Sequence, residues 1–81
     1  MLLADGFELA LLGHVLQNNG SQVACYNRDS CIEILVTRDG MTHEDAEEFF
    51  EFNVAGSHMG EETPIYLNVA TVEDLHELAD T

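Results

Sequence analysis

The junction Gly40-Met41-Thr42 constrains the fold of this chain more than any other stretch of its sequence. Glycine commonly ends a helix in the left-handed conformation and threonine commonly begins one, so the junction predicts the end of one helix and the start of another. Residues 30–39 are ambiguous by themselves, because their apolar positions also alternate as in a strand. The junction favours a helix there, and the two segments together predict a tight helix hairpin.

The segment after the junction has the pattern of an amphipathic helix that begins at His43. Thr42 and Asp45 stand at the spacing of a capping box, with Asp in place of the usual Glu, and acids in the first turn suit the helix dipole. Residues at helical spacing define two faces. The expected inner face is Ala46, Phe49, Phe50 and Asn53, and the expected outer face is Glu44, Glu48 and Glu51.

The rest of the chain predicts a small α+β fold. A dense apolar set between Asp5 and Gly20 predicts a mostly buried first helix. Residues 22–26 and 65–68 have the composition of two short strands that pair, and Thr71 with Asp74 repeats the capping spacing before a last helix. We expect one domain over residues 1–81, with a short, about two-stranded antiparallel sheet packed on three to four helices, including the helix hairpin. Residues 70–81 are expected to form a helical tail prone to fraying.

The charge of the chain excludes several classes of partner. Two Arg and no Lys stand against 16 acidic residues, which gives a formal net charge of −14. We do not expect so acidic a chain to bind nucleic acid directly or to adhere to an anionic membrane surface. No apolar run approaches the ~20 residues of a membrane span, and the first residues lack the basic segment of a secretory signal. A cytoplasmic protein is expected.

The spacings of cysteine, histidine and acidic residues give no catalytic or metal-binding motif. Cys25 and Cys31 are expected to be buried reduced thiols, because a C-x5-C spacing fits no common zinc site and a reducing compartment disfavours a disulfide. His43 and Glu47, with neighbouring acids and His58, would hold an ion only weakly. We expect no catalytic residues, no metal site, no cofactor and no enzymatic activity.

Acidic residues in the second half of the chain are the strongest functional signal. After Arg38 the sequence has no Lys or Arg, so these acids lack the usual i, i+4 ion pairs. One interpretation is that carboxylates spread over roughly 10 Å of a helix imitate a row of phosphates and bind a basic groove; the other is that the charge serves solubility alone. Phe52 lies about 200° around a helix from Phe50, which leaves one ring free for a partner. The candidate partner-binding residues are Glu44, Glu47, Glu48, Glu51, Glu61, Glu62 and Phe52.

A series of motifs from Cys31 onward carries a resemblance to a known group of proteins. The motifs are Cys31-Ile32-Glu33-Ile34-Leu35, Arg38-Asp39-Gly40-Met41-Thr42, Glu44-Asp45-Ala46-Glu47-Glu48-Phe49-Phe50, Phe52-Asn53-Val54, Gly56, Gly60-Glu61 and Thr63-Pro64-Ile65. With these motifs the chain resembles a family of small acidic proteins encoded by bacteriophages and prophages. The resemblance implies a viral origin and a site of action inside an infected bacterium. It carries no activity to this chain and identifies no target.

Two hypotheses follow for the function. In the first, the chain binds a basic host or phage protein through its acidic face, and in its narrowest form it inhibits a nucleic-acid-binding host defence complex, for example as an anti-CRISPR protein, by nucleic-acid mimicry. In the second, it is a structural or assembly accessory of a phage that associates with itself, as a homodimer, through Phe52 and a strand edge. Salt separates them, because ionic binding weakens at high ionic strength and apolar association does not.

Overall fold

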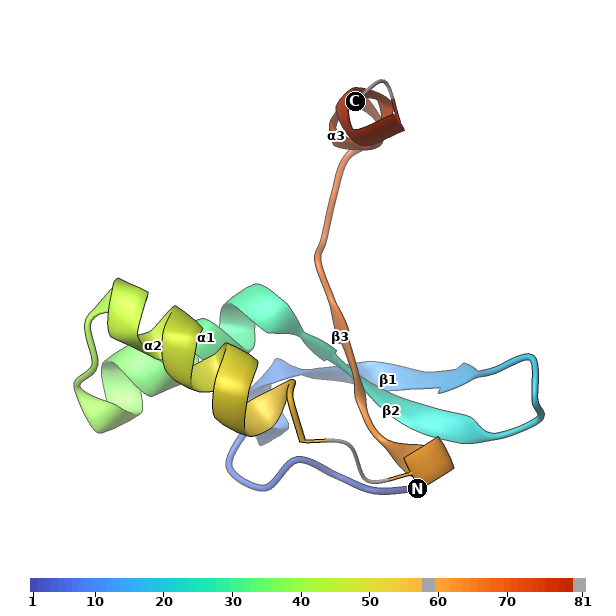
Figure 1. Cartoon of the computed structure of the whole chain (residues 1–81), viewed down its shortest axis with the longest axis horizontal. Coiled ribbons are helices and arrows are strands. Elements are labelled where there is room, and N and C mark those ends of the chain that lie inside the picture. The colour runs from blue at the N-terminus through green and yellow to red at the C-terminus, as the bar shows by residue number, and fades with distance from the viewer. Residues whose placement is uncertain (58–59, 80–81) are drawn as a thin grey trace.

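The structure, a computed structural model, describes residues 1–57 and 60–79 and arranges them as a three-stranded sheet, a helix hairpin and a separate C-terminal helix (Figure 1). The elements are the short helix η1 (Glu8–Ala10), β1 (Leu11–Leu16), β2 (Gln22–Asn27), α1 (Arg28–Asp39), α2 (His43–Phe49), the π-helical turn η2 (Phe50–Val54), the short helix η3 (Gly60–Glu62), β3 (Ile65–Leu67) and α3 (Val72–Ala79). The expected α+β class is confirmed, but the sheet differs from the expected one in strand number and direction.

The expected first helix is wrong, because residues 11–16 form strand β1. This strand pairs antiparallel with β2, and Leu16 lies opposite Gln22. A dense apolar run fits a strand as well as a helix, and the turn before β2 decides between them: Gln17 N–H donates to the Ser21 carbonyl over 2.8 Å and Gly20 has a φ of 89°. The expected helix end at Gly20 is therefore a hairpin turn.

The sheet is mixed rather than antiparallel. The predicted pairing of the two short strands is confirmed, since Cys25, Tyr26 and Asn27 lie opposite Ile65, Tyr66 and Leu67, but these strands run parallel. The helix hairpin forms the long crossover that a parallel pair requires. Strand order is β1-β2-β3, so β2 is central and β1 and β3 form the edges of the described sheet.

The helix hairpin follows from its caps, as predicted. Asn27 accepts a hydrogen bond from the Ser30 N–H at the start of α1, and Gly40 ends that helix in the left-handed conformation with a φ of 69°. Thr42 Oγ1 accepts from the Asp45 N–H over 3.1 Å, and α2 begins at His43. Residues 30–39 are therefore helical.

The core lies between the sheet and this hairpin. Tyr26, in the central strand, stacks on Tyr66 with ring centroids 5.8 Å apart, and Phe50 meets Tyr66 edge-on at 5.0 Å. The remaining buried members of this cluster are Phe7, Ala10, Ala24, Cys31, Ile32, Leu35 and Ala46. Each aromatic pair adds about 0.5–1.5 kcal/mol beyond the area it buries.

The expected inner face of α2 is only half correct. Ala46 and Phe50 are buried, whereas Phe49 and Asn53 are exposed. Phe49 lies on the outer side of α2, beside Asp45 and Glu48. The helix widens into the π-helical turn η2 at Phe50, where each turn holds more residues, so Asn53 rotates away from the sheet.

The last helix, α3, stands away from the rest of the molecule at the end of an extended segment (Figure 1). The predicted capping box is present: Asp74 N–H donates to Thr71 Oγ1 over 3.2 Å, and Thr71 N–H donates to Asp74 Oδ2 over 3.0 Å. None of the residues from Val72 to Ala79 is buried. The last two positions of the expected tail lie outside the described residues.

Candidate protein-binding face

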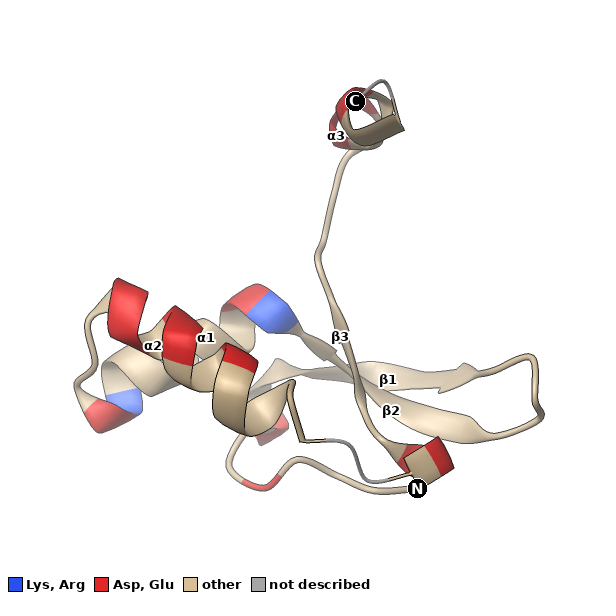
Figure 2. Ribbon diagram, in the orientation of Figure 1, with Lys and Arg blue, Asp and Glu red and all other residues tan. Residues whose placement is uncertain are grey.

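The fold divides the six candidate acids into two groups. Glu44, Glu47, Glu48 and Glu51 lie along α2 and η2, whereas Glu61 and Glu62 lie on η3 near the N-terminus (Figure 2). Glu62 Oε1 accepts a 2.7 Å contact from the N-terminal ammonium. The six acids therefore do not form one continuous surface.

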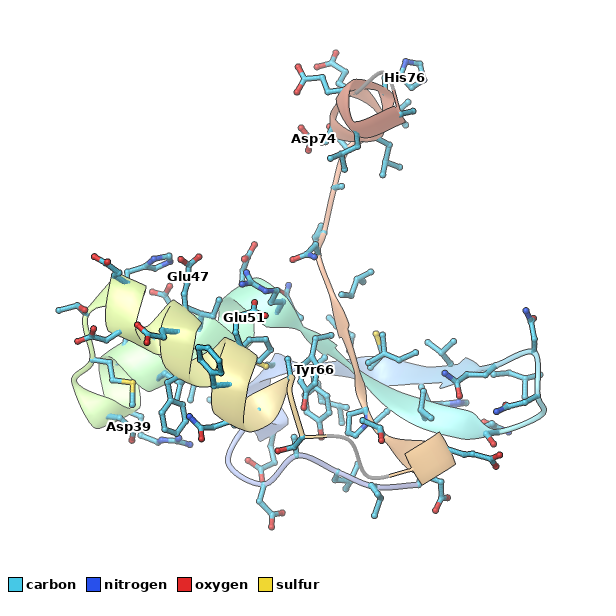
Figure 3. All side chains as sticks on the ribbon, viewed as in Figure 1. Asp39, Glu47, Glu51, Tyr66, Asp74 and His76 are labelled. Atoms are coloured by element: carbon cyan, nitrogen blue, oxygen red, sulfur yellow. The ribbon has the colours of Figure 1, made fainter. Side chains whose placement is uncertain are left out.

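Glu51 forms an intramolecular ion pair with Arg28. Its Oε1 lies 2.6 Å from Nη2 and 3.2 Å from Nε of Arg28, at the start of α1. That hydrogen bond is the main reason why the pKa of Arg28 is raised, and Glu47 adds a weaker attraction. Glu47 and Glu51 lie on the same side of the α2–η2 helix (Figure 3). The Arg28–Glu51 pair links the start of α1 to η2, and a partner would have to compete with Arg28 for Glu51.

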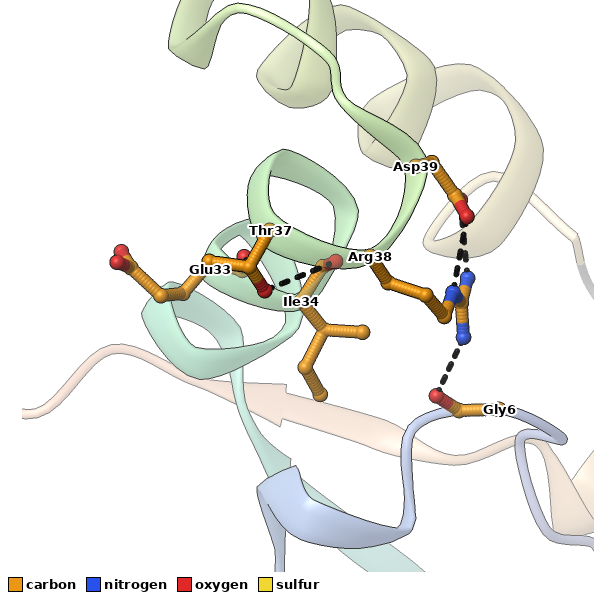
Figure 4. A network of polar contacts seen from close by, with 6 residues as sticks. All are labelled: Gly6, Glu33, Ile34, Thr37, Arg38 and Asp39. Carbon is orange, nitrogen blue, oxygen red and sulfur yellow. Dashed lines mark hydrogen bonds and ion pairs between the residues drawn. The ribbon is translucent and has the colours of Figure 1, made fainter.

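Arg38, the second cation, is also used within the fold. Its Nη1 donates to the Gly6 carbonyl over 2.8 Å, while Nε and Nη2 donate to Asp39 over 3.0 and 3.1 Å (Figure 4). The guanidinium lies 5.5 Å from the centre of the Phe7 ring. Both Arg side chains pair with carboxylates of the chain itself. The remaining acids therefore determine the electrostatic potential around the molecule, which is negative.

The other side of the α2–η2 helix carries a surface that combines acids with aromatic rings. Asp45, Glu48, Phe49, Phe52 and Asn53 line a shallow groove of about 330 Å³, which we call the acid-aromatic face. Phe52 is 76 % exposed and Phe49 is 39 % exposed. Asn53 Nδ2 donates to the Phe49 carbonyl over 3.3 Å. Glu44 lies exposed in the first turn of the same helix.

The sequence hypothesis found Glu48 and Phe52 in this face but missed Asp45, Phe49 and Asn53 as members of it. The sequence does indicate Asp45 and Phe49, because residues 45, 48, 49 and 52 follow the i, i+3, i+4, i+7 rule of one helix side. Assigning Phe49 and Asn53 to the core hid that signal. Carboxylates beside an exposed ring suit a cation, which they attract while the ring face contacts it.

A second pocket, of about 260 Å³, lies between the N-terminal segment, the end of η2 and β3. Apolar groups dominate its lining, and Asp5 and Tyr66 are the titratable residues among the described ones that line it. Burial raises the pKa of Tyr66.

The two cysteines are buried free thiols. Burial raises the pKa of Cys31 to about 11, so this thiol is protonated at neutral pH and unreactive. Among residues 1–57 and 60–79, no group of three or more His, Cys, Asp or Glu side chains is placed to hold a metal ion. His58, part of the weak ion site considered above, lies outside the described residues.

Comparisons of the chain with protein-family models, curated proteins and solved structures found no match. The resemblance to phage-encoded proteins therefore stays a prediction. Within the described part of the chain, no helix has the length and apolar character needed to cross a bilayer.

Proposed function

We propose that this protein is a non-enzymatic binding module that recognises a basic protein surface through the acid-aromatic face. The observation that carries the proposal is the exposed Phe52 ring, 76 % accessible, in one groove with the carboxylates of Asp45 and Glu48. A large apolar ring held in water beside carboxylates gains most by receiving an Arg or Lys side chain. Such a contact is worth about 0.5–1 kcal/mol at an exposed site and more once water is excluded.

The charge of the molecule supports a basic partner. A net charge of −14 accelerates association with a positively charged surface and repels acidic competitors. A basic groove that normally receives nucleic acid has the complementary charge. In its narrowest form the proposal is therefore inhibition of a nucleic-acid-binding host protein by mimicry, in an infected bacterium.

The test is a pull-down of tagged protein from bacterial lysate at low salt, with stepwise salt elution. We expect a basic protein on the wild-type chain and a loss of most of it on Glu48→Lys and on Phe52→Ala. Glu33→Lys, the same charge reversal on the exposed side of α1, and Leu9→Ala, the truncation of an exposed apolar side chain in η1, are the matched controls and should retain it. Equal retention by all variants would show that the face takes no part.

A second candidate, a self-associating assembly protein, is favoured by a different observation. Strand β1 is an edge of the described sheet and its residues from Leu11 to Leu16 carry no Asp, Glu, Lys or Arg. Natural edge strands usually carry charges or proline that prevent pairing with another chain. Copies of the chain retained at high salt, with no basic partner captured at low salt, would favour this second candidate.

A further inference from the structure

Helix α3 exposes an apolar stripe. Val72 is 70 % and Leu75 is 54 % exposed, Leu78 is also exposed, and the acids Glu73, Asp74 and Glu77 alternate with them in the helix. A helix of 8 residues is marginal in water even with a capping box. The stripe therefore needs a surface to pack against.

The accessible area of the chain exceeds that of a compact monomer of the same mass. A compact monomer of 9.0 kDa exposes about 4,850 Å² by the general scaling of area with mass, whereas this chain exposes 5766 Å². The difference, roughly 900 Å², is close to the ~800 Å² that each partner buries in a standard protein interface. The radius of gyration, 13.8 Å, likewise exceeds the ~12 Å of a compact chain of this length.

The β1–β2 hairpin offers the complementary surface. Leu12 and Val15 are exposed, and Leu16 is 68 % exposed at the strand end. The hairpin lies in the longest part of the sequence without Asp or Glu, between Glu8 and Asp29, so an acidic helix meets no like charge there. Its outer strand is an edge, and covering by a helix is a common way in which proteins protect such an edge.

In the structure α3 stands away from the hairpin of its own chain, and β3 ends at the opposite end of β2 from Leu16. Leu67 lies level with Asn27, whereas Leu16 lies level with Gln22, and these two ends of β2 are about 17 Å apart along the strand. The two edge strands are a further ~10 Å apart across the sheet. Residues 68–71 between β3 and α3 span at most ~14 Å, so only the later residues of α3 could reach Leu16 of the same chain. This segment carries α3 away from the sheet, as Figure 3 shows for Asp74 and His76.

We propose that α3 is an exchanged arm: the chain forms a two-fold homodimer in which α3 of each copy packs along the β1 edge of the other copy. Val72 and Leu75 contact Leu16 of the second chain, and symmetry forms the contact twice. The acids of α3 face solvent. This contact does not involve the acid-aromatic face, so the inference stands apart from the proposed binding of a basic partner.

The first experiment measures the mass of the full chain by light scattering across a range of concentrations. We expect twice 9.0 kDa for the wild-type chain and a monomer for Leu75→Glu and for Leu16→Glu. Leu9→Glu, the same charge addition at an exposed apolar position of η1, should remain a dimer. Circular dichroism shows whether each variant keeps its fold. A wild-type monomer at every concentration, or a dimer that neither variant weakens, overturns the proposal.

The second experiment distinguishes exchange from closure within one chain. Leu75→Cys and Leu16→Cys are prepared as separate variants, mixed and oxidised. Cross-linked heterodimer is expected from the mixture in excess over homodimers of either variant, because each new thiol lies beside the other variant's chain. A double variant that instead forms its disulfide within a monomer overturns the exchange. A mixture that gives no excess of heterodimer also contradicts it.

Discussion

Arg28 connects the start of α1 to the end of the helix hairpin through two kinds of contact. It donates two hydrogen bonds to Glu51, and its guanidinium carbon lies 5.6 Å from the centre of the buried Phe50 ring. Because Glu51 is solvent-exposed and the Phe50 ring is buried, we expect the contact with the ring to contribute more to stability than the ion pair.

We expect Arg28→Ala to lower the free energy of unfolding by about 1 kcal/mol, measured by urea denaturation. Glu51→Gln should cost less, because the ring contact persists. Arg28→Lys, which keeps the charge but loses the planar fork, should fall between them. A larger loss for Glu51→Gln than for Arg28→Ala would mean that the ion pair, not the ring, provides the stability.

The buried thiol of Cys31 is expected to lower the free energy of unfolding as the pH becomes alkaline. Burial raises the pKa of its thiol to about 11, whereas the unfolded thiol has an ordinary value near 9.0. Above that lower value the unfolded chain loses its proton first, so stability is complete below about pH 9 and falls as the pH rises toward 11. Burial of Tyr66 acts in the same direction.

We expect a loss of roughly 2 kcal/mol between pH 9 and 11 from this thiol. Cys31→Ala should flatten that part of the pH profile in urea titrations, although the smaller side chain lowers stability at every pH. A profile of the same slope in Cys31→Ala would assign the alkaline loss to other groups.

At the scale of elements, the N-cap of α2 provides a matched pair of threonines. Thr42 satisfies the free Asp45 N–H, whereas Thr37 lies within α1 and its hydroxyl donates to the Glu33 carbonyl, which already belongs to the helix. We expect Thr42→Ala to cost about 1 kcal/mol of unfolding free energy. Thr37→Ala should be neutral or slightly stabilising, because alanine is the better helix former. Equal effects of the two substitutions in urea denaturation would contradict the capping role.

The elements that the sequence predicted correctly are those whose ends are decided locally. Thr42, Gly40 and Thr71 each bond or bend within a few residues, and the helices they bound are present. Strand β1 was not predicted because its apolar run fits the period of a helix as well as that of a strand, and only pairing with β2 selects the strand. The parallel direction of β3 depends on the path of the whole crossover, which no short pattern encodes.

The residues of the candidate site were likewise predictable only where a local property of the sequence identifies them. Glu48 and Phe52 were identified from charge and from helical angle, which are local properties, and both line the groove on α2 and η2. The partition of the acids was not predictable, because the pairing of Glu51 with Arg28 depends on the return of η2 to the start of α1. The helix packs on the core through Ala46 and Phe50, which leaves Phe49 exposed as part of the acid-aromatic face.

At the scale of the whole molecule, the net charge of −14 gives the two proposed contacts opposite responses to salt. Binding of a basic partner at Asp45 and Glu48 relies on attraction between unlike charges, which salt screens. Exchange of α3 brings two acidic chains together over an apolar contact, and salt screens their mutual repulsion instead. We therefore expect the partner to dissociate and the dimer to tighten over the same rise in salt.

Sedimentation measured from about 20 to 500 mM NaCl tests this directly, since the screening length falls from about 20 Å to below 5 Å over that range. The dimer dissociation constant should decrease several-fold, while the partner captured at low salt is released. Glu73→Gln with Glu77→Gln, which reduces the charge of α3 without touching its stripe, should tighten the dimer at low salt and reduce its salt dependence. A dimer that weakens with salt in parallel with the partner would mean that both contacts are ionic, and the apolar arm would then not be the interface.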